Sequence, residues 1–315
     1  MQQQLDRISF FMDIPVIKNT PKIPMKIWPH CIPCILNMTL KAARLTLKDE
    51  EQARTFMKEV LTFDYFNGTD WSMTSPEVIK HIWMKLIETS GKPDPMKEIK
   101  EAQNRKALDI YSIARELVFK SREPLLDAIK LAIAGNAIDA MKDIRGEMPE
   151  KILEKWQQVE VDHHALHRFK ERLKGSQKIA YLGDNCGEIV FDRILIEVLN
   201  ELYRPGIFFI TRTVPIMNDA LLEDAISLGI DKIANVMENG LPEPFPGTYL
   251  KMIHPEIKTL IGTSDLVISK GGGNYDSLTE EETLRGKVSF LFLAKCHPYC
   301  SIHQVSLGSP ILYNF

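Results

Sequence analysis

The sequence has no long apolar run and no excess of charge of one sign. No stretch approaches the roughly 18 consecutive apolar residues that cross a bilayer. The formal net charge of -3 provides no basic field for nucleic acid. We therefore expect neither a membrane nor a nucleic-acid partner. Residues 1–24 lack a basic start and a small-residue cleavage site, so we expect no signal peptide and assign this extension no function.

Cysteine is scarce, with five residues in a chain of 315, so a disulfide framework is not expected. Cys31 and Cys34 form a C-x-x-C pair, and Cys296 and Cys300 lie near the other end of the chain. These four sulfurs are compatible with a zinc site, with a redox pair, or with reduced cysteines at a helix start. The sequence leaves that choice open. The sparse cysteine usage favours a reducing, cytoplasmic setting.

Two nucleotide-binding motifs are also missing. The phosphate loop GxxxxGK[ST] does not occur, and no GxGxxG follows the first predicted strand. The glycine run Gly271–Gly273 matches neither motif. Nucleoside triphosphates and NAD are therefore disfavoured as cofactors.

The hydrophobic pattern changes once along the chain. Residues 34–174 have helical periodicity, whereas from Lys178 onward short apolar runs alternate with helical segments. Such alternation predicts a mostly parallel sheet covered by helices. We expect an α/β protein with a Rossmann-like sheet in its C-terminal half, a helical domain over 25–175, and a metal- and phosphate-binding domain over 176–315. Strands are predicted at 179–182, 207–210, 233–236, 266–269 and 288–294, and helices between them at 189–202, 220–228 and 275–284.

The stretch from Lys178 to Asp192 predicts a buried strand, a tight loop and a helix. Its loop carries Asp184, Asn185 and Glu188. Carboxylate and amide oxygens are the ligands that Mg²⁺ and Mn²⁺ prefer. Gly-Asp-Asn is also ordinary turn and helix-cap chemistry, so this loop alone does not decide between the two interpretations.

Polar residues also follow two other predicted strands. Arg212, Asn218 and Asp219 come after the second strand, and Lys270 with Gly271–Asn274 comes after the fourth. The carboxyl ends of parallel strands meet at one sheet edge, so these groups are expected to converge with the first loop. Oxygen ligands, a lysine and a glycine run whose N–H groups face an anion suit a metal-assisted reaction at a phosphate group.

Each of these residues also has a structural interpretation. Asp219 is compatible with a first-turn acid that complements a helix dipole. Lys270 is compatible with a surface lysine, and the glycine run with a flexible loop. Asn136 follows the most apolar helix and fits either a C-cap or a group that reaches into a cleft between the two halves.

Several motifs together resemble the DUF89 family, and more narrowly its archaeal and bacterial subfamily of damage-control phosphatases with an N-terminal C-x-x-C. The resemblance covers residues 25 to about 305, in the family's order. The motifs are MKIWPHCIPC, AGNAID, GDNCGE, PIMNDA, KGGGNYDSL and the AKC that ends at Cys296.

The resemblance implies a metal-dependent phosphatase for sugar phosphates or damaged phosphometabolites, using Mn²⁺, Ni²⁺, Co²⁺ or Mg²⁺. The family's metal ligands fall on Asp184, Asn185 and Asp219. Its substrate-contacting or motif-defining residues fall on Asn136, Glu188, Lys270 and Asn274. The chain departs from the family at Gly272, where relatives often have Gln, and at Met96, where they often have Tyr.

We therefore expect a divalent ion on Asp184, Asn185 and Asp219 to bind a phosphomonoester of a small metabolite. Lys270 would pair with a phosphate oxygen, and the N–H groups around Gly271, Gly273 and Asn274 would surround the others. Metal-activated water is the favoured nucleophile, with Asp184 or Asp219 as alternatives.

Two other functions remain open at this stage: an S-adenosylmethionine-dependent protein carboxyl methyltransferase, and a non-catalytic metal- or metabolite-binding protein. The physiological substrate, the metal and the oligomeric state do not follow from the sequence.

Overall fold

The computed structural model describes residues 26–138 and 149–315, and the extension 1–24 lies outside them. A six-stranded sheet has the order β3-β2-β1-β4-β5-β6. Its first five strands are parallel, and β6 runs antiparallel to β5. The strands are β1 Lys178–Leu182, β2 Gly206–Thr211, β3 Asn235–Glu238, β4 Leu266–Lys270, β5 Val288–Leu293 and β6 Pro310–Asn314. The predicted α/β class with a mostly parallel sheet is confirmed.

Four predicted strands form within a residue or two of their expected ends, because their apolar runs are buried in the sheet centre. Ile179 of β1 pairs with Ile207 of β2 on one side and with Leu266 of β4 on the other. The strand expected at 233–236 begins two residues late, because a 3₁₀ turn at Ile230–Lys232 precedes it. The sequence prediction missed β6, which forms the edge beyond β5.

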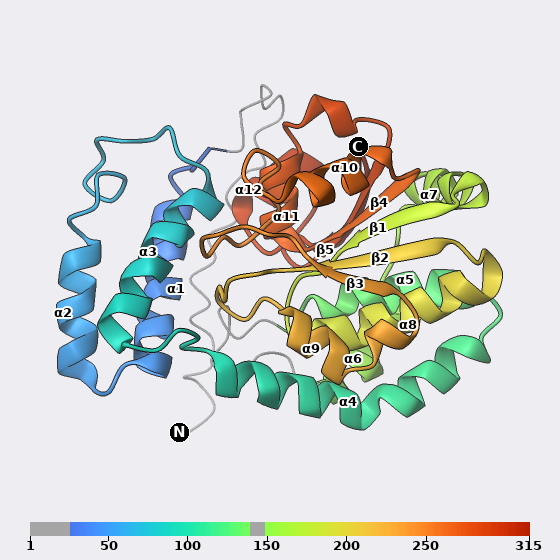
Figure 1. The fold of residues 1–315 in the computed structure, drawn as a ribbon, viewed down its shortest axis with the longest axis horizontal. Coiled ribbons are helices and arrows are strands. Elements are labelled where there is room, and N and C mark those ends of the chain that lie inside the picture. The colour runs from blue at the N-terminus through green and yellow to red at the C-terminus, as the bar shows by residue number, and fades with distance from the viewer. Residues whose placement is uncertain (1–25, 139–148) are drawn as a thin grey trace, which may run out of the picture.

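Helices cover both faces of the sheet (Figure 1). One hydrophobic core joins the sheet to α4, α5, α7 and α8, and a second joins the other face to α10 and α11. The helices that cover the sheet are α4 Lys97–Phe119, α5 Pro124–Gly135, α6 Pro149–Lys155, α7 His163–Gly175, α8 Glu188–Leu202, α9 Leu222–Ser227, α10 Pro255–Thr263, α11 Gly271–Leu278 and α12 His297–His303. Short 3₁₀ turns lie at Trp156–Gln158 and Glu282–Leu284.

The first three helices form a separate layer beside the sheet, at the left of Figure 1. They are α1 Cys31–Thr46, α2 Glu50–Val60 and α3 Ser75–Ser90, and they share their own core around Phe56 and Trp83. Thr74 and Glu77 form a capping box that fixes the start of α3, and Gly91 in a left-handed conformation ends it. The domain boundary at 175 stays a prediction; in the packing, α4–α7 share a core with the sheet.

No helix among the described residues is both long enough and apolar enough to cross a membrane.

The crossing of α5 and α8 depends on Gly135, because a Cβ there would lie 2.7 Å from Cδ2 of Phe191. We expect Gly135→Ala to lower the free energy of unfolding by about 1–3 kcal/mol through overpacking. Gly262→Ala in α10 is the matched control, since no heavy atom lies within 4 Å of its added Cβ. It should be neutral or stabilise by up to about 1 kcal/mol. Urea unfolding of both variants tests this, and equal changes would contradict the packing argument.

Candidate active site

Two loops at the carboxyl edge of the sheet lie against each other through backbone hydrogen bonds. One follows β1 and the other follows β2. The amide of Ala220 donates to the carbonyl of Asp184 at 2.8 Å, and the amide of Cys186 donates to that of Asn218 at 2.8 Å. Asn185 and Asp219 pair between them as an isolated antiparallel bridge. The structure thus brings Asp184, Asn185 and Asp219 together.

The side chains of this group are tightly held. Asn185 Nδ2 donates to Asp184 Oδ2 at 2.7 Å and lies 3.2 Å from Glu188 Oε2. Arg212 Nε donates to Asp219 Oδ2 at 2.7 Å, and its Nη2 lies 3.7 Å from Asp184 Oδ1. Because Arg212 is only 2% exposed, its guanidinium is a buried positive charge behind the two carboxylates.

Lys270 occupies a different place from the one expected. Its ammonium donates to Glu188 Oε1 and Asp192 Oδ1, both at 2.6 Å, and to the carbonyl of Ala132 at 2.9 Å. Its three protons therefore already have acceptors, and the side chain is fully buried. The expectation that Lys270 pairs with a phosphate oxygen does not fit this structure. Burial lowers the pKa of Lys270, but the carboxylates of Asp192 and Glu188 outweigh it and raise the pKa overall.

Asn136 and Asn274, two of the predicted substrate contacts, are buried beside this group and bonded to protein atoms. Asn136 Nδ2 donates to Glu188 Oε2 at 2.8 Å and lies 3.3 Å from Asp184 Oδ2, while its Oδ1 accepts from the amide of Leu293. Asn274 Nδ2 donates to the carbonyl of Lys270 at 2.8 Å. The structure gives both residues, together with Glu188, a position that supports the two loops.

The glycine run opens a helix and is not a loop ahead of one, because α11 begins at Gly271, four residues before the predicted start. A Cβ on Gly271 would lie 1.9 Å from Oδ2 of Asp184, and its φ is +78°. No other residue type fits that contact. Gly271 therefore lets the start of α11 approach the Asp184 carboxylate directly.

The electrostatics of the group favour a cation. Burial raises the pKa of Asp184 well above its usual range, and the carboxylates of Glu188 and Asp219 raise it further. Arg212 and Lys295 act in the opposite direction. Four buried carboxylates (Asp184, Glu188, Asp192 and Asp219) face two buried cations (Arg212 and Lys270). The two aspartates and the Asn185 oxygen form an oxygen-only donor set, which fits a hard divalent ion.

Within 26–138 and 149–315, no three His, Cys, Asp or Glu side chains converge in an arrangement that could hold a metal ion. The set of Asp184, Asn185 and Asp219 is not such a group, because its third ligand is the amide of Asn185. The zinc interpretation of the cysteines is therefore not supported. Cys31, Cys34 and Cys296 line a cavity instead, and burial raises the pKa of the Cys31 thiol.

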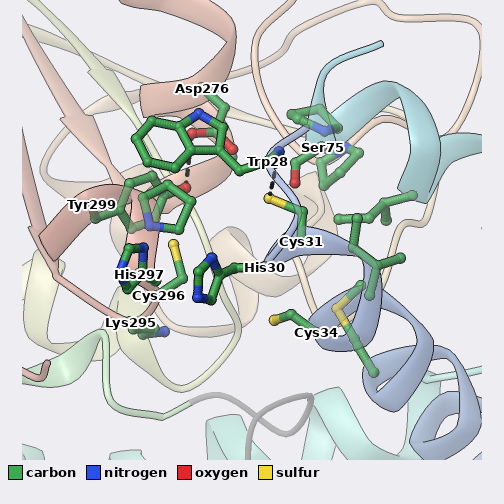
Figure 2. Close-up of a pocket in the computed structure, with 18 of the residues that line it drawn as sticks. Trp28, His30, Cys31, Cys34, Ser75, Asp276, Lys295, Cys296, His297 and Tyr299 are labelled. Atoms are coloured by element: carbon green, nitrogen blue, oxygen red, sulfur yellow. Dashed lines mark hydrogen bonds between the residues drawn. The ribbon is translucent and has the colours of Figure 1, made fainter. Parts of the chain in front are cut away.

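A cavity of about 510 Å³ lies between the α1–α3 layer and the sheet edge. Asp184, Asn185 and Asp219 form part of its wall, together with Gly272 and Gly273 of α11. Figure 2 shows further wall residues from the segment that precedes α1 and from α12, among them Trp28, His297 and Tyr299. The rings of His30 and His297 stack at 4.0 Å between centroids.

Several residues at the site were not singled out from the sequence. Arg212 was noted only as a polar residue after a strand, although a buried arginine at that edge has to pair with a carboxylate. Lys295 lies in the AKC motif and lines the cavity. Asp276 lies in the KGGGNYDSL motif, and Tyr299 Oη donates to its Oδ1 at 2.9 Å. Nothing in the sequence indicated that Trp28 lines the site, except that it lies in the motif MKIWPHCIPC.

Comparison with known proteins gives a consistent result. Residues 27–311 match the family model described as the damage-control phosphatase ARMT1-like domain. An uncharacterized protein of Methanocaldococcus jannaschii is 33% identical over 91% of this chain and 95% of its own length. A damage-control phosphatase of Pyrococcus horikoshii is 29% identical over 86% and 92%, and one of Archaeoglobus fulgidus is 28% identical over 91% and 98%.

A solved structure extends this likeness to the fold. The crystal structure of a DUF89 family protein from Pyrococcus horikoshii superimposes with a TM-score of 0.80 and 26% identity, over 92% of this chain and 99% of that one.

The Lys270 network yields a prediction about stability. Replacement by methionine leaves Glu188 and Asp192 buried without their cation, so Lys270→Met should lower the free energy of unfolding by about 3–5 kcal/mol at neutral pH. Burial raises the pKa of Asp192 to about 6, and Lys270 opposes that rise. Without Lys270 the two carboxyl groups take up protons more readily in the folded state, so the decrease in the free energy of unfolding should become smaller toward pH 5. Urea unfolding of the variant and the parent protein at neutral pH and at pH 5 measures this decrease. A small decrease at both pH values would contradict the network.

Asp276 yields a prediction about pH. Burial raises its pKa from 3.8 to about 7, although the hydrogen bond from Tyr299 lowers it. The folded state therefore binds more protons than the unfolded chain between these values, and stability falls as pH rises through that window, by about 4 kcal/mol in all. Asp276→Asn should remove this contribution. Urea unfolding at about pH 4 and about pH 8 compares the two proteins, and an identical pH dependence would contradict the shift.

Proposed function

The chain belongs to the damage-control phosphatase ARMT1-like family, also described as DUF89, and on this premise we propose that it is a metal-dependent phosphatase of small phosphomonoesters. The family places the chain among phosphatases. The metal, the residues and the substrate class proposed below rest on the geometry of the site.

One observation carries the proposal: two carboxylates and an amide meet on the wall of a cavity that also carries a lysine. Asp184, Asn185 and Asp219 supply the oxygen ligands, and Lys295 lies on the same wall. Buried carboxylates outnumber buried cations there, so the site favours a positive ion. A bound divalent ion would neutralise phosphate charge and lower the pKa of a water ligand.

The surrounding residues hold this ligand set in place. Arg212 fixes one oxygen of Asp219, and its charge restrains repulsion between Asp219 and Asp184. Asn136 and Asn185 donate to Asp184 and fix the orientation of its carboxylate. Metal affinity depends on such outer contacts as well as on the ligands themselves.

The phosphate group is expected to lie at the start of α11. The first N–H groups of a helix have no partner inside the helix and attract anions. Gly272 and Gly273 belong to this first turn and line the cavity. Lys295 supplies a positive charge on the same wall, in the role that the sequence had assigned to Lys270.

The substrate is proposed to be a small phosphorylated metabolite. The cavity volume of about 510 Å³ lies in the range that suits such ligands. Two relatives are named damage-control phosphatases. Mn²⁺, Co²⁺, Ni²⁺ and Mg²⁺ are the candidate ions.

Phosphate release from 4-nitrophenyl phosphate tests the proposal. We expect activity that EDTA abolishes and that one or more of Mn²⁺, Co²⁺, Ni²⁺ and Mg²⁺ restores. Asp184→Ala should lower kcat/KM at least about 100-fold, because losing a ligand costs no less than losing an outer contact. Asp231→Ala, at an exposed position, is the control and should not change it. Full activity of Asp184→Ala, or activity that is insensitive to chelation, would overturn the assignment.

A further inference from the structure

A tyrosine hydroxyl lies against the first turn of α11, where the phosphate group is expected. A Cβ at Gly272 would lie 2.6 Å from Oη of Tyr299, and both residues line the cavity. Because Gly272 has no side chain, the hydroxyl approaches the start of the helix directly. A phosphomonoester bound at this helix start therefore lies beside the Tyr299 hydroxyl.

The same hydroxyl is bonded to a carboxyl group one turn further along α11. Oη of Tyr299 donates to Oδ1 of Asp276 at 2.9 Å, as the dashed line in Figure 2 shows. Asp276 follows Gly272 by four residues, so the two lie on one face of the helix, and helical side chains lean toward the N-terminus. The tyrosine–aspartate pair thus extends along the cavity wall from the first turn of α11 to Asp276.

The surroundings of Asp276 favour its protonated form. Burial raises its pKa from 3.8 to about 7, and the hydrogen bond from Tyr299 offsets only part of that rise. The ionisable groups that interact with Asp276 are the hydroxyls of Tyr275 and Tyr299 and the thiol of Cys31, none of which is a cation. Near neutral pH this carboxyl group can therefore both hold and release a proton.

Protonation of Asp276 reverses the hydrogen bond of the pair. A carboxylic acid donates to Oη of Tyr299, and the phenolic O–H is then free to donate to a ligand. Burial and the nearby carboxylate raise the pKa of Tyr299 well above its usual range, so the phenol keeps its proton in the resting protein. The pair can thus present one proton at the cavity and hold a second one behind it.

We propose that Tyr299 and Asp276 form a proton relay that protonates the leaving oxygen of the phosphomonoester. The inference rests on the proposed phosphatase function and adds its general acid. The oxygen of a water forms a bond to phosphorus, the bond between phosphorus and the ester oxygen breaks, and its electron pair stays on the ester oxygen. That oxygen takes the proton of Tyr299, and Oη takes the proton of Asp276. The attacking water releases one proton to the solvent, and the solvent returns one to Asp276.

Three aromatic esters that differ in their leaving group test the relay in the manganese-loaded protein. 4-Nitrophenyl phosphate releases a stabilised anion that needs no proton, phenyl phosphate releases a more basic one, and benzyl phosphate releases an alkoxide. General acid catalysis contributes about 10²–10⁴-fold, so Tyr299→Phe should lower kcat/KM for benzyl phosphate about 100-fold and Asp276→Asn about tenfold. Neither should lower that for 4-nitrophenyl phosphate more than about threefold, and phenyl phosphate should lie between.

Tyr275→Phe is the matched control, because it removes a hydroxyl from the same helix at a residue that does not line the cavity. It should leave kcat/KM for all three esters unchanged. Retained hydrolysis of 4-nitrophenyl phosphate shows that a relay variant is folded and holds its metal. Equal losses on the three esters would mean a structural role for the pair and would overturn the relay.

The pH dependence provides a second test. With benzyl phosphate, kcat/KM of the parent protein should fall as the pH rises through about 7, because ionised Asp276 has no proton to pass on. Asp276→Asn should lack this fall, and a fall that persists in the variant would overturn the role of Asp276. A parent protein with EDTA-sensitive activity whose relay variants show no leaving-group effect would overturn the relay alone. A parent protein that hydrolyses none of the esters would overturn the proposed function as well.

Discussion

Buried negative charge at the carboxyl edge of the sheet is the constraint on which the rest of the structure depends. An unpaired buried carboxylate is costly, so each one needs a cation or donors nearby. Lys270 meets this need for Glu188 and Asp192 and also bonds to the end of α5 through the carbonyl of Ala132. A single ammonium thus joins β4, α8 and α5 behind the two loops.

Each buried cation serves two buried carboxylates, Lys270 behind the loops and Arg212 on the cavity side, so a net negative charge remains in the network. Arg212 is the buried cation in contact with Asp219, and it lies near Asp184 at a longer distance. The carboxylates that face the cavity therefore keep an excess of negative charge, which a divalent ion would balance. The charges that stabilise the fold and those that favour metal binding belong to one network, so the residues of one role cannot be changed without affecting the other.

The sequence predicts those parts of this arrangement that depend on local pattern and general topology. Apolar runs locate β1, β2, β4 and β5, and the parallel order brings the loops after β1 and β2 to one edge. The choice of partner for Lys270 lies beyond local pattern, since its acceptors are 78 to 138 residues away. The local sequence around a lysine that follows a strand is compatible with a phosphate partner and with two buried carboxylates, so it does not distinguish between them. The start of α11 was missed because three successive glycines have low helix propensity, which close packing against Asp184 overrides.

The two ends of the cavity are built from different parts of the chain. The sheet edge and the first turn of α11 supply the end that carries charge, whereas the segment before α1 supplies Trp28 at the other. The hydrophobic core of the α1–α3 layer also includes Ile216 of the loop after β2, and Met217 packs against it. The layer is therefore packed directly against the loop that carries Asp219, so the two ends of the cavity are held in a fixed relation. The attack on phosphorus is expected to depend on the loops after β1 and β2, and the fit of the organic group on the walls that the other elements contribute.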